Sequence, residues 1–164
     1  MTDQHNRRIL ISCISGILLI SGTLFTVWLI KITDYEMRQD LLTKAEMISQ
    51  SLDLQMLCTL TGTKEDNEKP EYQRLKKQFA SLVETDRNCR FIYLMGRKED
   101  GRVFFYLDSE PPGSKEESSA GQMYGEITLK DIQVFDTKRA STVGPESDRW
   151  GTWITSLVPV SDPQ

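Results

Sequence analysis

The sequence predicts an α+β fold, in which an N-terminal transmembrane helix runs into a long helix that packs on an antiparallel sheet. Three observations support this class. Residues 9–30 are apolar and uncharged, and residues 34–60 repeat apolar side chains at helical spacing. The segments after Asp86 are short, rich in aromatic residues and separated by turn residues, as is typical of strands.

The apolar run Ile9–Ile30 predicts a membrane helix. About twenty residues at a rise of about 1.5 Å span a bilayer core of roughly 30 Å. A cleaved signal peptide is the alternative, but its apolar region is usually only about 7–15 residues long and ends in small residues. This run is longer and ends in Val27–Ile30, so a signal anchor is favoured.

The charges around the run predict its orientation. Arg7 and Arg8 precede it, and positive charge is retained on the cytoplasmic side of a membrane. We therefore expect residues 1–8 to form a cytoplasmic leader and residues 9–32 to anchor the chain in the plasma (inner) membrane. Residues 33–164 would then form an extracytoplasmic, or periplasmic, domain.

The first segment after the anchor, Asp34–Leu60, has the pattern of a long amphipathic helix. No proline or glycine separates it from the membrane run, so the two may form one continuous helix. Its apolar positions would pack on a sheet or form a homodimer seam, and both can hold for different parts of one helix. These positions are Met37, Leu41, Ala45, Ile48 and Leu52.

A polar loop, Thr61–Lys69, leads to a second predicted helix, Glu71–Glu84, with Pro70 suited to its first turn. Its apolar face repeats at helical spacing. Lys76 and Lys77 are expected on the opposite, solvated face.

A hairpin is predicted next. Arg90–Met95 is apolar on both faces and should be a central strand, and Val103–Asp108 should return beside it after a turn at Lys98–Gly101. Ser114–Gly121 is charged and serine-rich, and is expected to be an exposed loop.

The C-terminal third predicts one short helix and two strands. Thr128 and Asp131 have the spacing of a capping box for a helix over residues 129–135. Strands are expected at Ala140–Val143, which Gly144 and Pro145 would end, and at Thr152–Val160. Residues 161–164 resemble the start of another turn, so we expect a fragment whose sheet lacks its last strand or strands.

Composition excludes several classes of function. The formal net charge is −4, which argues against nucleic acid or an anionic membrane surface as a partner, although the anchor itself lies in a lipid bilayer. The only histidine, His5, lies in the leader, so the exported part has no Ser-His-Asp device and no histidine metal site. Paired acids such as Glu116 and Glu117 are expected to be solvated turn residues. No catalytic residue, metal or cofactor is therefore predicted.

The three cysteines bear on compartment. Cys13 lies in the membrane run, whereas Cys58 and Cys89 would face an oxidising space. A disulfide between them would close a loop of about 32 residues and stabilise the fold by about 3–4 kcal/mol. The alternative is two separate buried thiols.

The residues that suit small-molecule recognition are aromatic or charged and lie on the predicted strands. Some of these residues have an alternative role. Asp108 could bond to the loop that follows it, Arg149 could form an exposed salt bridge, and Trp150 and Trp153 could fill the core. The candidate ligand-binding residues are Tyr93, Tyr106, Asp108, Arg149 and Trp153.

Two segments, CRFIYLMGRKEDGRVFFYLDSEPP and DRWGTWITSLVPVSDP, resemble the extracytoplasmic PAS-like sensor domains, also called Cache or PDC domains. These stand at the N-terminus of bacterial sensor histidine kinases and diguanylate cyclases, and the resemblance covers about residues 9–164. It implies an antiparallel sheet of about five strands behind a long helix, with the ligand between sheet and loops, near the five candidates. It also implies a second membrane helix and a C-terminal kinase or cyclase module, which would lie outside these residues.

The expected function is a membrane-anchored sensory input domain that detects an extracytoplasmic small molecule. A ligand-free input domain that acts by dimerisation or protein contact is an alternative. A pilin-like structural subunit is less favoured, because Gly16 and Gly22 lie inside the apolar run and the run contains no acid.

Overall fold

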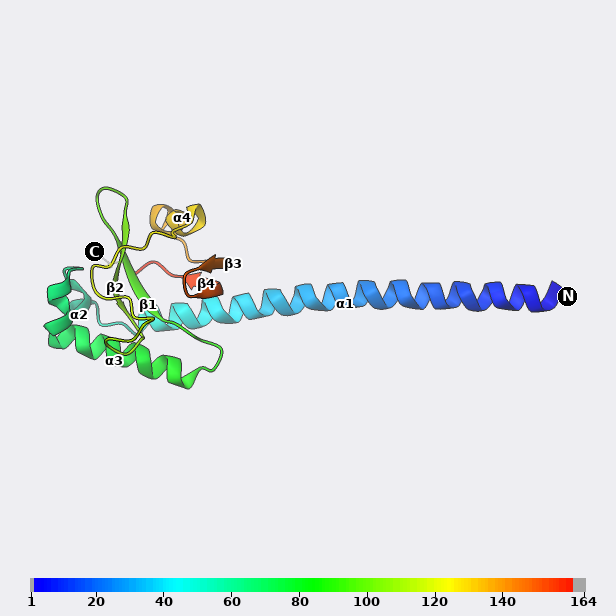
Figure 1. Cartoon of the computed structure of the whole chain (residues 1–164), viewed down its shortest axis with the longest axis horizontal. Coiled ribbons are helices and arrows are strands. Elements are labelled where there is room, and N and C mark those ends of the chain that lie inside the picture. Colours follow the sequence, from blue (N-terminus) through cyan, green and yellow to red (C-terminus); the bar gives the residue numbers. More distant parts are fainter. Residues whose placement is uncertain (1, 161–164) are drawn as a thin grey trace. The chain divides into compact units, whose positions relative to one another are not determined.

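The computed structural model describes residues 2–160 and divides the chain into two compact units, Met1–Leu41 and Leu42–Gln164 (Figure 1). The first unit is entirely helical, because α1 spans Thr2–Gln50 without a break. From Cys13 onward this helix contains a stretch that is long and apolar enough to cross a membrane. The hydroxyls of Thr23 and Thr26 donate to carbonyls of their own helix, at 2.9 Å in each case.

The predicted helix Asp34–Leu60 is wrong at its C-terminal end, because α1 stops at Gln50 and a separate helix, α2, covers Leu54–Cys58. Asp53 causes the interruption. Its carboxylate accepts the backbone N–H groups of Gln55 and Met56 at 2.9 and 3.3 Å, which caps a new helix. Aspartate competes with helical backbone hydrogen bonds in this way, and so favours a helix start over a helix interior.

The second predicted helix is confirmed to within one residue at each end as α3, Pro70–Thr85, with proline in its first turn. The expected loop before it contains a short 3₁₀-helix, η1, at Lys64–Glu68. One face of α3 packs into a hydrophobic core that also takes in side chains from β2 and from the segments around α2. The buried members of this core are Leu52, Leu60, Tyr72, Leu75, Phe79, Leu107 and Ala120.

The predicted hairpin is confirmed as β1, Tyr93–Arg97, paired antiparallel with β2, Val103–Asp108. Gly101 takes φ +85° in the turn, a conformation that glycine adopts without strain. Residues 121–124 cover the other edge of β2, where Phe105 N–H donates to the Gln122 carbonyl at 2.9 Å. β1 begins later than the predicted strand Arg90–Met95, and within residues 2–160 β2 is its only neighbouring strand.

The capping box is confirmed at α4, Leu129–Thr137, where the Asp131 side chain accepts the Thr128 N–H at 2.8 Å. A second hairpin follows, with β3 at Ser141–Asp148 and β4 at Gly151–Leu157. The prediction that Gly144 and Pro145 end the first of these strands is wrong. The pairing shifts register between Val143 and Glu146, and this bulge accommodates the proline within a continuing strand.

The α+β class is thus confirmed, but the described strands form two antiparallel sheets of two strands each, β1–β2 and β3–β4. A single sheet of about five strands, which the resemblance implies, is not what these residues form. The turn expected at residues 161–164 lies outside the described residues.

Candidate functional site

Four of the five candidate residues lie in or beside two places in the C-terminal unit, and Tyr106 lies apart from both. One is an aromatic cluster formed by Tyr93, Phe105, Tyr124 and Trp150. The other is a buried charge network formed by Lys76, Asp108 and Glu117, together with the loop over residues 109–121 that it fixes.

Phe105 is the centre of the aromatic cluster. Its ring centroid lies 5.8 Å from Tyr93, 5.5 Å from Tyr124 and 6.2 Å from Trp150, each in an edge-to-face arrangement. Tyr124 and Trp150 stack with their centroids 6.5 Å apart. Edge-to-face pairs bring the positive ring edge to the negative ring face, so the cluster holds its own geometry.

Four different segments supply these rings. Tyr93 opens β1 and Phe105 lies within β2, while Tyr124 is held against β2 because its N–H donates to the Val103 carbonyl at 2.9 Å. Trp150 occupies the turn between β3 and β4. The cluster therefore joins the two hairpins, although their strands do not pair.

Asp148 shapes the turn that carries Trp150. Its Oδ1 accepts the N–H groups of Trp150 and Gly151 at 2.8 and 3.0 Å. The indole N–H of Trp153 donates to the same oxygen at 3.0 Å, and the Trp153 ring packs edge-on against Phe91 at 5.1 Å. Trp153 therefore borders the cluster through Asp148.

Both phenols of the cluster stay protonated at neutral pH. Burial raises the pKa of Tyr93 to about 12, against the opposing effect of a hydrogen bond to Thr155. Burial also raises the pKa of Tyr124, and the negative charges of Asp148 and Asp131 add to the shift. The cluster thus combines ring faces, two neutral hydroxyls and nearby carboxylates, which suits recognition of a small molecule.

Arg149 lies at the border of the cluster and is exposed. Its guanidinium forms two hydrogen bonds to the Glu126 carboxylate, at 2.9 and 2.7 Å, and lies 4.8 Å from the Trp150 ring centroid. The alternative of an exposed salt bridge is confirmed, since 46% of the Arg149 side chain is accessible.

Tyr106 and Asp108 do not join the cluster. The Tyr106 ring packs against Phe104, with centroids 4.8 Å apart, and both rings lie over Gly96, where a Cβ would meet them at 2.6 Å. Asp108 belongs to the buried charge network. The structure therefore brings Tyr93, Arg149 and Trp153 to the aromatic cluster or its border and separates Tyr106 and Asp108 from it.

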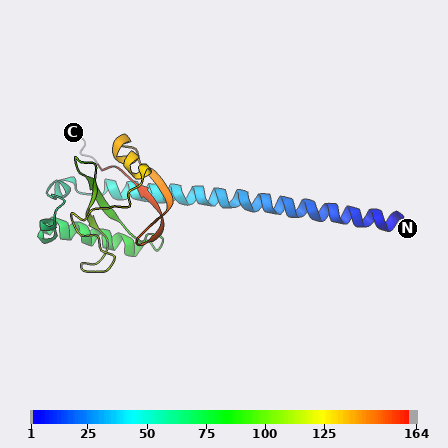
Figure 2. The same cartoon turned by 45° about the horizontal axis from the view of Figure 1, so that its top comes forward.

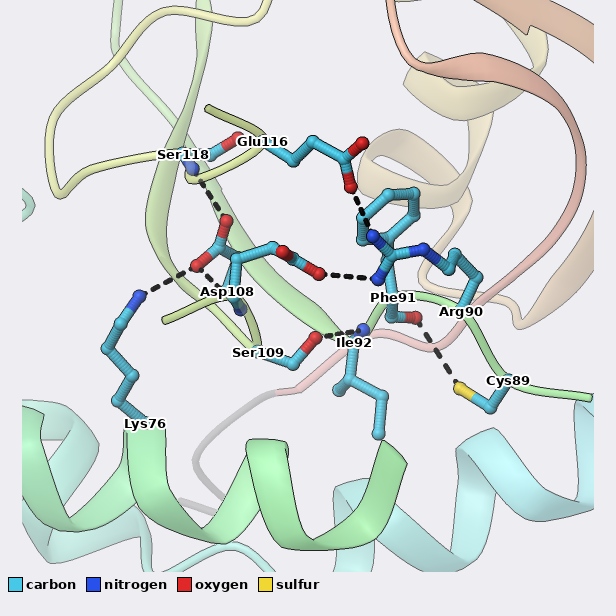
Figure 3. A network of polar contacts seen from close by, with 10 residues as sticks. Lys76, Cys89, Arg90, Phe91, Ile92, Asp108, Ser109, Glu116 and Ser118 are labelled. Carbon is cyan, nitrogen blue, oxygen red and sulfur yellow. Dashed lines mark hydrogen bonds and ion pairs between the residues drawn. The ribbon is translucent and has the colours of Figure 1, made fainter. Parts of the chain in front are cut away.

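The buried charge network joins α3 to the end of β2 (Figure 3). Lys76 Nζ lies 2.8 Å from Asp108 Oδ1 and 3.0 Å from Glu117 Oε1. Asp108 also accepts the backbone N–H groups of Glu110 and Ser118, at 3.2 and 2.5 Å. The Lys76 and Asp108 side chains are each only 5% exposed. The alternative role for Asp108, a strand-end carboxylate bonded to the following loop, is confirmed.

Arg90 holds the same loop from the other side, as Figure 3 shows. It pairs with Glu110 at 2.6 Å and also with Glu116. The expectation of an exposed loop over Ser114–Gly121 is wrong for Ser118 and Ala120, which are both buried. The positive charges of Lys76 on α3 and of Arg90 pair with acidic residues of this loop and hold it against the fold.

The prediction of a solvated Lys76 is also wrong, although Lys77 is exposed. Burial alone would lower the pKa of Lys76, but the carboxylates of Asp108 and Glu117 outweigh it, and the pKa is raised. Burial raises the pKa of Asp108 against the opposing effect of Lys76. Helical spacing indicates the burial of Lys76, because residue 76 lies one turn after the buried Tyr72, on the same face of the helix.

Cys58 and Cys89 are separate free thiols, so neither the disulfide nor the alternative of two buried thiols describes them fully. Cys58 is exposed, and Cys89 is half-buried with its Sγ 3.6 Å from the Phe91 carbonyl. Burial raises the pKa of the Cys89 thiol, which makes it a weak nucleophile.

Within residues 2–160, no three side chains of histidine, cysteine, aspartate or glutamate gather closely enough to hold a metal ion. No family model matches the chain, and no curated protein or solved structure proves similar to it.

Proposed function

We propose that the chain is a membrane-anchored sensory input domain of a bacterial signal-transduction receptor, of the sensor histidine kinase or diguanylate cyclase type. The observation that carries this proposal is the continuity of α1. The helix runs from the apolar segment to Gln50 without a break, and its residues from Leu42 onward belong to the C-terminal unit. A membrane segment and a folded domain thus share one helix.

An ion pair within the C-terminal unit connects α1 to the C-terminal end of α3. Lys44 Nζ pairs with Asp86 at 2.9 Å, and Asp86 is the residue at which α3 ends. A change in the packing of α3 or of the segment leading to β1 would therefore act on α1. The basic residues Arg7 and Arg8 support a cytoplasmic N-terminus and an extracytoplasmic C-terminal unit.

The aromatic cluster is the proposed ligand site. A ligand there would bridge β1, β2 and the turn between β3 and β4, so its affinity would depend on how the two hairpins are arranged. A ligand shifts a conformational equilibrium only through different affinity for the two arrangements. The small molecule recognised by Tyr93, Tyr124 and Trp150 would combine an apolar body with one or two polar groups.

A second function, dimerisation without a ligand, is supported by apolar side chains of α1 beyond the membrane run. Met37 and Met47 are both exposed. A homodimer seam over residues 34–50, the part of the predicted Asp34–Leu60 helix that lies in α1, would cover such residues.

A thermal-shift screen distinguishes the two functions. The full chain in lipid nanodiscs is screened against a library of small metabolites, with the melting temperature and tryptophan fluorescence as readouts. We expect at least one compound to raise the melting temperature, and the Tyr93→Phe/Tyr124→Phe variant to lose this shift while both rings remain. Tyr35→Phe, which changes an exposed tyrosine of α1, is the control. A library that never shifts the wild-type protein would contradict the ligand site and favour dimerisation.

A further inference from the structure

Three of the four rings in the aromatic cluster keep accessible surface. Phe105 at the centre is only 3% exposed, whereas Tyr93, Tyr124 and Trp150 around it are half-buried. The cluster lies where the two hairpins, β1–β2 and β3–β4, come side by side in the C-terminal unit, as Figure 2 shows. A ligand can therefore contact the outer rings without entering a closed cavity.

Negative charge acts on the same rings. Burial is the largest cause of the raised pKa of both phenols, and the charges of Asp131 and Asp148 add to it. Glu126 contributes further to the shift of Tyr124. Asp131 is buried, so water and salt screen its charge only weakly. This field repels an anionic ligand and attracts a cationic one.

The chain already places one cation on the cluster. The Arg149 guanidinium lies over Trp150, 4.8 Å from its ring centroid, which is within the distance of about 6 Å at which a ring attracts a cation. Glu126 pairs with this guanidinium. In contrast, neither Asp131 nor Asp148 forms an ion pair with any residue from 2 to 160. Their two negative charges therefore remain available to a cationic ligand.

The hydrogen bonds of these two carboxylates indicate which cation fits. One oxygen of Asp148 accepts three N–H groups, two from the backbone and one from the Trp153 indole. One oxygen of Asp131 accepts the N–H and the hydroxyl of Thr128. Because donors of the fold itself engage these oxygens, the carboxylates offer a ligand charge more than hydrogen bonds. A quaternary ammonium group suits this arrangement, since it has no N–H and is held by charge and ring faces.

We propose that the aromatic cluster binds an organic cation of the quaternary ammonium type, with its methyl groups against the rings of Tyr93, Tyr124 and Trp150. The proposal rests on the ligand site proposed above and adds the chemical class of the ligand. A trimethylammonium group occurs both in small solutes and in lipid headgroups, and the two sources share this chemistry.

Choline and its uncharged isostere 3,3-dimethylbutan-1-ol, in which carbon replaces the nitrogen, test the role of charge. The full chain is held in nanodiscs free of choline lipids, and each compound is titrated with the melting temperature and tryptophan fluorescence as readouts. We expect choline to bind about tenfold more tightly than the isostere, because only choline is attracted by the rings and carboxylates. Propionate, a small anion, should bind more weakly than either.

The nanodisc lipid distinguishes the two sources of the cation. A melting temperature that rises with free choline in choline-free nanodiscs indicates a soluble ligand. A rise that occurs only in phosphatidylcholine nanodiscs indicates a lipid headgroup. Either result supports the proposal if Trp150→Leu, which removes the ring but keeps an apolar side chain, abolishes it.

Two exposed residues change the charge at the border of the cluster and leave the rings in place. Arg149→Gln removes a competing cation and should raise the affinity for choline about threefold, whereas Glu126→Gln leaves Arg149 unpaired and should lower it by a similar factor. Neither variant should alter binding of the uncharged isostere. Lys77→Gln, which removes an exposed cation of α3, is the control and should have no effect.

Equal affinities for choline and its isostere, or tighter binding of propionate, would overturn the proposal. So would an uncharged library compound that stabilises the wild type but not Tyr93→Phe/Tyr124→Phe while choline fails to bind, although the ligand site itself would then stand. No stabilisation by choline or by any library compound would contradict both the cation and the ligand site.

Discussion

Replacing Asp108 with alanine is expected to lower the free energy of unfolding of the C-terminal unit by about 3–5 kcal/mol. The change leaves the buried Lys76 ammonium without its nearest carboxylate. It also removes the acceptor for the N–H groups of Glu110 and Ser118, which hold the loop after β2. Urea unfolding followed by tryptophan fluorescence measures the effect.

Two further variants serve as controls for Asp108→Ala. Asp100→Ala removes the carboxylate of an exposed pair with Arg102 and should lower stability far less than Asp108→Ala does. The double variant Lys76→Met/Asp108→Leu replaces both charges by apolar groups and should be more stable than Asp108→Ala alone. A loss below about 1 kcal/mol for Asp108→Ala would show that the network does not stabilise the fold.

Replacing Asp66 with asparagine is expected to cost about 2 kcal/mol at neutral pH and to remove part of the acid sensitivity of the fold. Asp66 is fully buried, and its carboxylate accepts the N–H groups of Thr61 and Gly62 at 2.8 and 2.7 Å. Burial alone would raise its pKa, but the ion pair with Lys69 and these N–H groups lower it from 3.8 to about 2.

The direction of the pH dependence follows from this depressed pKa. The ionised carboxylate stabilises the folded state, so its contribution is complete above about pH 4 and is lost as the pH falls toward 2. Unfolding free energies measured from pH 6 to pH 2 should therefore converge for wild type and Asp66→Asn. Glu68→Gln, at a nearby exposed position, is the control. Parallel curves for wild type and Asp66→Asn across this range would contradict the assignment.

Local patterns predicted the elements whose causes are local. Pro70 and the apolar spacing after it located α3, and Thr128 with Asp131 located the start of α4. The hairpin turn at Gly101 was equally clear. Each of these features depends on residues that lie close together in the sequence, so local sequence patterns are enough to predict it.

The features that sequence reasoning missed depend on distant residues or on competition between two local preferences. Lys76 is buried because Asp108, 32 residues away, and Glu117 pair with it. The helix after the membrane run was predicted too long, because the capping preference of Asp53 outweighed the helical spacing around it. The aromatic cluster was only partly predicted, since Tyr93 and Tyr124 both meet Phe105 through tertiary packing.

Labelling of Cys58 in cells tests most directly the proposal that α1 anchors an extracytoplasmic domain in the membrane. Cys58 is exposed on α2, and Cys13→Ser/Cys89→Ser leaves it as the only thiol. We expect a small membrane-impermeant maleimide to label Cys58 in intact cells and the labelled chain to stay in the membrane fraction. Labelling that occurs only after the cells are lysed would contradict it.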